Sequence, residues 1–192
     1  VYTSTETTQG KSVAWTDSYY PDDTLQHAGV ITGLGGYAGH SHKYKQKGGS
    51  GYLFRTATVQ DFSAVTGACL LVRASVYDEV GGLDEQFAVA FNDVDFCLRV
   101  RDAGYRIAWT PYAQLVHYES KSRGGDEKDP AKAARFAAEQ QRLYAIHGKE
   151  DILDDPYYNP NLTRDREDFS ESDDLRRLKE GTVTVRFRGG EA

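Results

Sequence analysis

The hydrophobic and polar positions in the middle of the chain predict short strands and helices. The stretch DFSAVTGACLLVR (61–73) is apolar and rich in β-branched residues, which predicts a buried strand. SVYDEVGG (75–82) predicts a short helix that ends at its glycines. LDEQFAVAF (83–91) predicts a short extended segment that leads into the next helix. This mixture of elements indicates a layered α/β or α+β domain.

The stretch FNDVDFCLRVRDAGY (91–105) predicts a helix with one apolar side. Asn92 is a good N-cap residue, and Gly104 is a common stop. Two acids, Asp93 and Asp95, stand at the helix head, where unpaired backbone N–H groups and the helix dipole stabilise negative charge. For this stretch alone, capping is therefore the favoured explanation of these acids, and catalysis is the alternative. The apolar positions are Val94, Phe96, Cys97, Leu98, Val100 and Ala103.

Further strands and a long helix follow toward the C-terminus. RIAWT (106–110) and AQLVHYE (113–119) predict two short strands that Pro111 separates. Pro130 begins an alanine-rich helix, AKAARFAAEQQRLYAIHG, because proline is favoured in the first turn. VTVRFR (183–188) predicts a last edge strand. The buried stripe of the long helix is expected at Phe136, Leu143 and Ile146.

The two ends of the chain differ from its middle. Residues 1–19 are polar, lack a clear period and are left unplaced. Five glycines between Gly29 and Gly39 predict a loop or interrupted strands. We therefore expect one domain over residues 20–148, followed by an acidic, irregular extension over residues 149–192.

Composition narrows the class of protein. The chain has 192 residues, of which 39% are hydrophobic, enough for one domain with a real core. A formal net charge of −6 without a basic stripe argues against a nucleic-acid binder. No apolar run is long enough to cross a bilayer. Cys69 and Cys97 lack metal-type spacing and predict reduced thiols in a cytosolic protein.

One long stretch carries a family resemblance. The run SAVTGACLLVRASVYDEVGGLDEQFAVAFNDVDFCLRVRDAGYRIAWTPYAQLVHYESKSRG, with PDDTLQHAGVITGLGGYAGH before it and DPYYNPNLT and DFS after it, resembles family 2 glycosyltransferases of the rhamnosyltransferase-like, cell-surface polysaccharide type. The likeness spans roughly Tyr20 to Ser170. Several separated motifs in the same order are more specific than any single motif.

The resemblance implies a fold and a missing half. Those enzymes have a GT-A fold, a Rossmann-like mixed sheet with flanking helices, whose first half binds the nucleotide-sugar and ends in a D-x-D metal motif. Nothing before Tyr20 resembles that half, and Asp93-Val94-Asp95 lies at the family's second acidic motif. We therefore expect the C-terminal, acceptor-side half of the domain, and we expect the chain alone to be inactive.

The resemblance also assigns roles around two motifs. Gly67 and Ala68, in TGAC, resemble the glycine-containing strand end beside the donor sugar, although a plain strand bulge explains this glycine equally well. Asn92-Asp93 resembles the family's Glu-Asp pair, whose aspartate is the general base, so Asn92 departs from the pattern. Asp95 belongs to the same substrate-binding group, with a helix-start role or an arginine partner as its simpler explanation.

A histidine and a basic loop complete the expected site. His117 resembles the C-terminal histidine that helps to hold a divalent metal, Mn²⁺ or Mg²⁺, shared with a D-x-D motif absent from this chain. A lone strand histidine is more often structural. Lys121, Ser122 and Arg123 form a basic loop that could fold over a diphosphate, or simply remain solvated.

Two functions of different classes follow from these features. The first is an inverting glycosyltransferase that moves a sugar from a nucleotide-sugar donor to a glycan or lipid-linked acceptor in cell-surface polysaccharide synthesis. The resemblance implies a cytoplasmic location, with peripheral association at the inner face of the membrane as an option. The second is a non-catalytic glycan-binding or scaffold module. The 13 tyrosines suit sugar stacking in either case.

Overall fold

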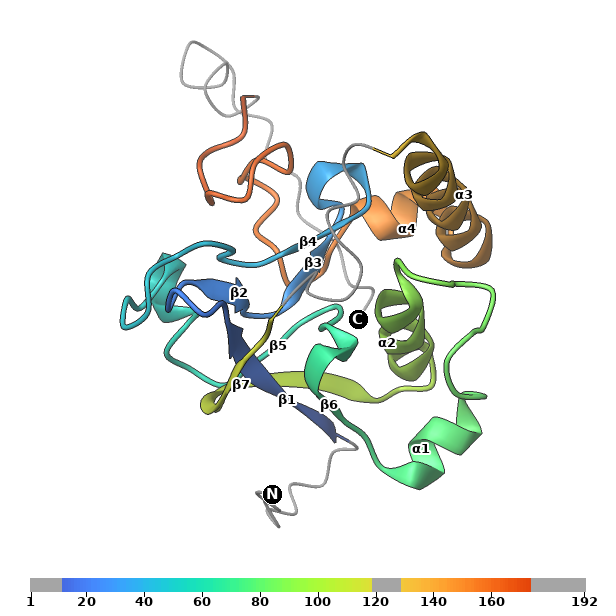
Figure 1. The fold of residues 1–192 in the computed structure, drawn as a ribbon, viewed down its shortest axis with the longest axis horizontal. Helices are drawn as coiled ribbons and strands as arrows, with labels where there is room; N and C mark the ends of the chain where they lie inside the picture. Colours follow the sequence, from blue (N-terminus) through green and yellow to red (C-terminus); the bar gives the residue numbers. More distant parts are fainter. Residues whose placement is uncertain (1–11, 119–128, 174–192) are drawn as a thin grey trace, which may run out of the picture.

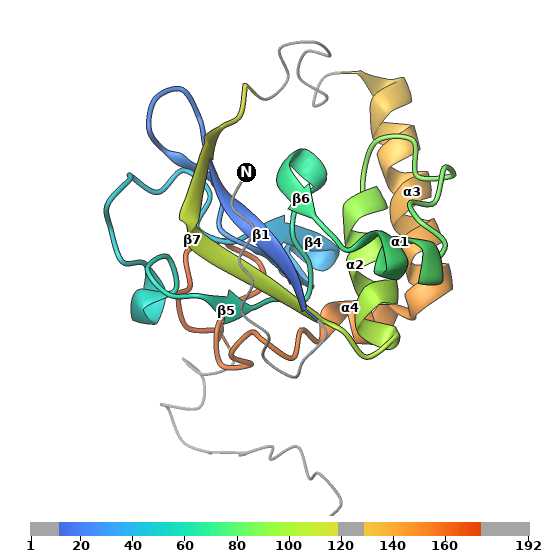
Figure 2. The same ribbon diagram turned by 90° about the horizontal axis from the view of Figure 1, so that it is seen from below.

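The computed structural model describes residues 12–118 and 129–173, and side chains from Tyr19 onward. Figures 1 and 2 show the helices gathered on one side of the molecule and the strands on the other. The strands are β1 (Ser12–Tyr19), β2 (Leu25–His27), β3 (Val30–Thr32), β4 (Ala38–His40), β5 (Gln60–Asp61), β6 (Leu70–Leu71) and β7 (Arg106–Val116). The helices are α1 (Ala74–Glu79), α2 (Asn92–Asp102), α3 (Pro130–His147) and α4 (Lys149–Leu153), with 3₁₀ helices η1 (Leu34–Gly36), η2 (Tyr52–Phe54) and η3 (Gly67–Cys69).

Strand β1 lies at the centre of the main sheet. It pairs in parallel with β7 and antiparallel with both β2 and β6, while β5 pairs with the other edge of β7. Strands β3 and β4 form a separate antiparallel pair. The mixed sheet with flanking helices confirms the expected α/β class. Residues 12–19, which the sequence left unplaced, form the central strand.

Strand β7 is one strand where the sequence predicted two. Thr16 of β1 lies opposite Thr110, but the next residue, Asp17, lies opposite Gln114. The residues between, which include Pro111, therefore bulge out of the ladder. Proline lacks a backbone N–H and is tolerated at such an irregularity, so it bends the strand without ending it.

The segment 61–73 does not form the single buried strand that its composition predicted. It contains the end of β5, the turn η3 and the short strand β6. Phe62, Ala64 and Val65 are buried without being part of a long strand. The helix expected at 75–82 is confirmed as α1, whereas residues 83–91 form turns and bends in place of an extended segment.

Helix α3 begins at Pro130, as predicted, and Asp129 caps it by accepting a hydrogen bond from the Ala131 N–H at 2.9 Å. Its buried positions are Glu139 and Leu143. The predicted stripe is therefore only partly correct. Phe136 is 36% exposed and Ile146 is 44% exposed.

The core lies between the main sheet and the helices. Helix α2 packs against β7, whose Trp109 meets Phe62 edge to face with ring centroids 6.1 Å apart. The segment after residue 149 also contributes to the core, through α4 and the buried side chains of Ile152 and Tyr158. Up to residue 173 it is therefore part of the domain, and the strand predicted at 183–188 lies outside the described residues.

Among the described helices, none combines the length and apolar character needed to cross a membrane.

Candidate functional site

The head of α2 differs from the predicted cap. Phe91, not Asn92, is the N-cap residue, and its backbone is left-handed with φ 62° and ψ 2°. The Asn92 Oδ1 atom accepts a hydrogen bond from the Asp93 N–H at 2.7 Å, and Asp93 Oδ1 accepts one from the Val94 N–H at 2.9 Å. A left-handed backbone is rare for a bulky residue such as phenylalanine, and such residues cluster at functional sites.

Asp93 and Gly67, which are 26 residues apart, meet directly. The Gly67 N–H donates a hydrogen bond to Asp93 Oδ2 at 2.7 Å. The Asp93 side chain is half-buried and Gly67 is exposed, so this contact lies at the surface. A carboxylate has about four acceptor positions, and the two backbone N–H groups occupy only two of them. Asp93 therefore retains acceptor capacity toward solvent.

Gly67 does not lie at a strand end or in a strand bulge. It begins the 3₁₀ turn η3, which Thr66 caps through a bond from the Ala68 N–H to Thr66 Oγ1 at 3.3 Å. A Cβ atom at position 67 would contact the Asp93 side chain at an ordinary 3.5 Å. The described backbone therefore does not itself require glycine at position 67, and the Asp93 side chain is the nearest neighbour of such a Cβ atom.

The sheet register brings His117 to the same end of the molecule as Gly67. β1 and β7 are parallel, so their C-terminal ends lie at the same end of the sheet. At that end the His117 N–H donates a hydrogen bond to the Tyr19 carbonyl at 2.7 Å. β6 is antiparallel to β1, so Gly67, which precedes β6, lies toward that same end. Ligands of open α/β sheets bind beyond the carboxyl ends of the strands.

His117 has one feature of an unfilled ligand. Its Nδ1 atom is buried and has no hydrogen-bond partner among the described residues. The described part of the chain contains no group of three or more histidine, cysteine or acidic side chains that could hold a metal. His117 could thus supply one ligand of a shared metal centre. The predicted phosphate loop at Lys121, Ser122 and Arg123 lies outside the described residues.

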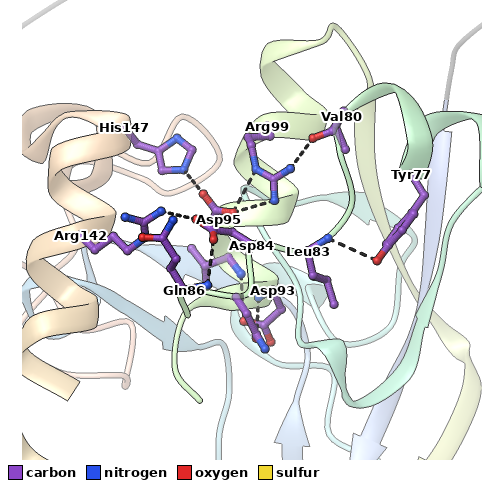
Figure 3. Close-up of polar contacts among 12 residues, drawn as sticks. Tyr77, Val80, Leu83, Asp84, Gln86, Asp93, Asp95, Arg99, Arg142 and His147 are labelled. Carbon is purple, nitrogen blue, oxygen red and sulfur yellow. Dashed lines mark hydrogen bonds and ion pairs between the residues drawn. The ribbon is translucent and has the colours of Figure 1, made fainter. Parts of the chain in front are cut away.

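Asp95 is directed away from Asp93, into the protein (Figure 3). Its side chain is 1% exposed, and it accepts hydrogen bonds from Arg99 at 2.7 Å and from His147 at 2.8 Å. Burial alone raises the pKa of Asp95, but the hydrogen bonds from His147 and Arg99 outweigh burial and leave this pKa below its ordinary value. The expected arginine partner is present. The expected substrate contact is wrong, because a buried, fully engaged carboxylate does not face a ligand.

The buried polar contacts of two residues, Glu139 and His27, were not predicted from the sequence. The Glu139 carboxylate, 5% exposed on α3, accepts hydrogen bonds from the N–H groups of Ala88, Val89 and Ala90 at 3.1, 3.3 and 2.6 Å. The buried His27 Nε2 atom faces the N–H groups of Gly29 and Thr66 at 3.2 and 3.4 Å. A signal for Glu139 existed, since it lies four residues before Leu143 on the buried side of α3.

The sequence of the chain matches one known protein family. The sequence model described as glycosyl transferase family group 2 matches residues 23–144, more than half of the chain. The chain belongs to this family. The α/β architecture is consistent with a GT-A-type domain, and the resemblance identified in the sequence is confirmed.

Several relatives are much longer than this family member. The chain is 49% identical over 152 residues to the uncharacterized protein y4gI of Sinorhizobium fredii, a match that covers 79% of the chain and 16% of the relative. It is 36% identical over 145 residues to the O-antigen biosynthesis protein RfbC of Myxococcus xanthus, which covers 75% of the chain and 11% of the relative. A Mycobacterium tuberculosis N-acetylglucosaminyl-diphospho-decaprenol L-rhamnosyltransferase is 36% identical over 80 residues, 42% of the chain and 24% of that enzyme. No solved structure matches the chain.

Proposed function

We propose that this chain forms the acceptor-side half of an inverting glycosyltransferase for polysaccharide synthesis. The enzyme would move a sugar from a nucleotide-sugar donor to a glycan or lipid-linked acceptor. Family membership supports glycosyl transfer, and the names of two relatives support polysaccharide and lipid-linked substrates. The observation that carries the proposal is the half-buried Asp93 carboxylate, which the N–H of the exposed Gly67 holds at the surface of the protein.

Asp93 would act as the general base. A sugar hydroxyl is a weak nucleophile until a positioned base accepts its proton. In the proposed step the acceptor O–H bond breaks, its oxygen bonds to the anomeric carbon, and the bond to the nucleoside diphosphate breaks on the opposite face. The proton stays on Asp93. The Gly67 and Val94 N–H groups each hold one carboxylate oxygen, and each oxygen keeps a further acceptor position that a sugar hydroxyl could occupy.

A divalent metal, Mn²⁺ or Mg²⁺, fits one residue of this chain. The Nδ1 atom of His117 is buried and has no hydrogen-bond partner within residues 12–118 and 129–173, which suits a metal bond, since imidazole nitrogen and oxygen ligands can share such ions. The other protein ligands would come from a D-x-D motif outside these 192 residues. A bound metal would neutralise charge on the leaving diphosphate. We further propose that the chain alone does not catalyse transfer.

The test uses Asp93→Asn in an active transferase that contains this chain. Asparagine can keep the hydrogen bond from Gly67 or the one from Val94, but it cannot accept the acceptor's proton, so the rate should fall about 10²–10⁴-fold while donor binding persists. Asp95→Asn is the matched control, one residue away in the same helix turn, and should act through stability. Retained activity in Asp93→Asn, together with a folded but inactive Asp95→Asn, would reject Asp93 as the base.

A further inference from the structure

Three side chains of α3 contact residues 84–95, the segment that contains Asp93. Glu139 binds the N–H groups of residues 88–90, Arg142 pairs with Asp84 at 2.6 Å, and His147 pairs with Asp95 at 2.8 Å. Figure 3 shows Arg142 and His147 extending from α3 toward this segment. The contacts thus begin before Asp93 and end two residues after it.

The Glu139 contact comes just before the strained point of the segment. Phe91 follows Ala90 directly and is held in the left-handed region with φ 62°. Its ring packs against Tyr37 and Phe136, with ring centroids 5.7 and 5.0 Å apart. A bulky residue keeps such a backbone only where its surroundings enforce it. Glu139 on one side and the aromatic packing on the other provide that enforcement.

The hydrogen bonds from residues 88–90 require a side chain with two acceptor atoms, as in a carboxylate. Ala88, Val89 and Ala90 present three N–H donors to one point, and a carboxylate is a side chain that offers only acceptors. Hydrogen bonds to a charged group are roughly twice as strong as neutral ones. Glutamine would turn an NH₂ group toward at least one of these donors. A buried glutamate is costly unless it is paired. Arg135, one turn earlier on α3, lies 3.9 Å from Glu139 Oε1, and the three N–H groups of residues 88–90 are the closer partners.

We propose that Glu139 is a positioning residue for Asp93: by holding residues 88–90 it fixes the strained turn at Phe91 and so the direction of the Asp93 carboxylate toward Gly67. This inference rests on the proposed function for its catalytic meaning. Its structural part, the coupling between Glu139 and the Asp93–Gly67 contact, can be measured without any activity.

The first experiment measures amide hydrogen exchange in the chain itself. Glu139→Gln should speed exchange at residues 88–90 by about 10-fold or more, because hydrogen bonds to a charged acceptor are lost. It should also speed exchange of the Gly67 amide, which Glu139 does not contact. Glu150→Gln, which removes the same charge from an exposed site on α4, should change neither. Should Glu139→Gln fail to fold, Glu139→Asp keeps the charge and is measured in its place.

The second experiment is a double-mutant cycle in an active transferase that contains this chain. Glu139→Gln should lower kcat about 10-fold or more with little change in the donor KM, since a misplaced base affects only the transition state. In an Asp93→Asn background the same change should have almost no further effect. A residue that merely supports folding would lower the active fraction equally in both backgrounds.

The outcomes of these experiments distinguish the positioning role of Glu139 from the general-base role of Asp93. Unchanged exchange at residues 88–90 and Gly67, or equal rate losses in both backgrounds, would overturn the positioning role. If Asp93→Asn keeps full activity, the proposed function fails, while the exchange measurement still decides whether Glu139 holds the Asp93–Gly67 contact. Faster exchange at Gly67 in the Glu139 variant, together with non-additive rate losses, would support both.

Discussion

Asp93 and Asp95 are separated by one residue, yet the helix head directs their carboxylates into different surroundings. Each residue of a helix turns by about 100°, so positions two apart lie on nearly opposite sides. Asp93 is half-exposed beside Gly67, and Asp95 is buried between Arg99 and His147. One acid is therefore partly accessible to solvent, and the other ties α2 to α3.

Asp95→Asn should destabilise the chain through this buried cluster. Removing one charge leaves Arg99 and His147 without a full partner, and the expected loss is about 2 kcal/mol in the free energy of unfolding. Urea unfolding at pH 7 measures the loss, with Asp93→Asn as the control. Because the folded pKa of Asp95 is lowered, its contribution is complete above about pH 4 and disappears as the pH falls through the folded pKa. Equal stability of the two variants would contradict this role.

Two buried histidines should make the protein sensitive to mild acid. Burial, followed by the charges of Lys45 and Arg55, lowers the pKa of His42 to about 4 from its ordinary value of 6.5. Burial, followed by His40, holds the pKa of His27 well below the same value. The unfolded chain binds these protons first, so stability is complete above pH 6.5 and falls below it, by about 2 kcal/mol for His42 alone at pH 5.

Urea midpoints measured from pH 7.5 to pH 5 test this sensitivity. His27→Gln is the comparison variant, because its amide oxygen can accept a hydrogen bond in place of Nε2 and glutamine does not titrate. Its stability should change less steeply with pH than that of the parent chain. A parent chain that is equally stable at both ends of this range would show that neither histidine stays neutral in the fold.

At the scale of elements, β1 decides whether the sheet forms. Its backbone pairs with three other strands, and Ala14 lies opposite both Leu71 and Ala108. Ala14→Pro removes a backbone N–H and the freedom of φ at this central position, so it should cost about 2 kcal/mol or more. Ala14→Ser keeps the N–H and is the matched control. Thermal unfolding followed by circular dichroism compares them, and a proline variant as stable as the serine variant would remove β1 from the folding core.

The elements that were predictable carry local signals. Pro130 and the glycines after α1 mark helix ends within a few residues, and the structure confirms both. The strands were less predictable because their identity depends on distant partners. β1 mixes polar and apolar residues and becomes a central strand only through pairing with β7, and segment 61–73 divides where η3 turns toward Asp93.

The site was predictable to a similar extent. The family motifs name Gly67 and Asp93, and the fold brings the two into contact. Glu139 lies outside those motifs, in a helix whose alanines suggest an apolar stripe. Its role depends on three backbone N–H groups about 50 residues away, which no local pattern encodes. The turn at Phe91 likewise follows from tertiary packing and not from its sequence.

At the scale of the whole molecule, the chain spans 16% and 11% of two of its longer relatives. The described residues present a carboxylate, an exposed glycine and a single candidate metal ligand at one sheet edge. The proposed function assigns the nucleotide pocket and the D-x-D motif to residues outside this chain. Donor recognition should therefore require those residues, whereas the acceptor-side geometry should form without them.

The isolated chain should accordingly fail to bind a nucleotide-sugar usefully. Calorimetric titration with UDP- and dTDP-sugars in the presence of Mn²⁺ should give dissociation constants weaker than about 1 mM, because a single histidine and a few surface contacts supply less than ~4 kcal/mol. An active transferase that contains the chain is the positive control under the same conditions. Micromolar binding by the isolated chain would mean that these 192 residues hold a complete donor site. In that case a His117→Ala variant that loses Mn²⁺-dependent binding would locate that site at the C-terminal edge of β1 and β7.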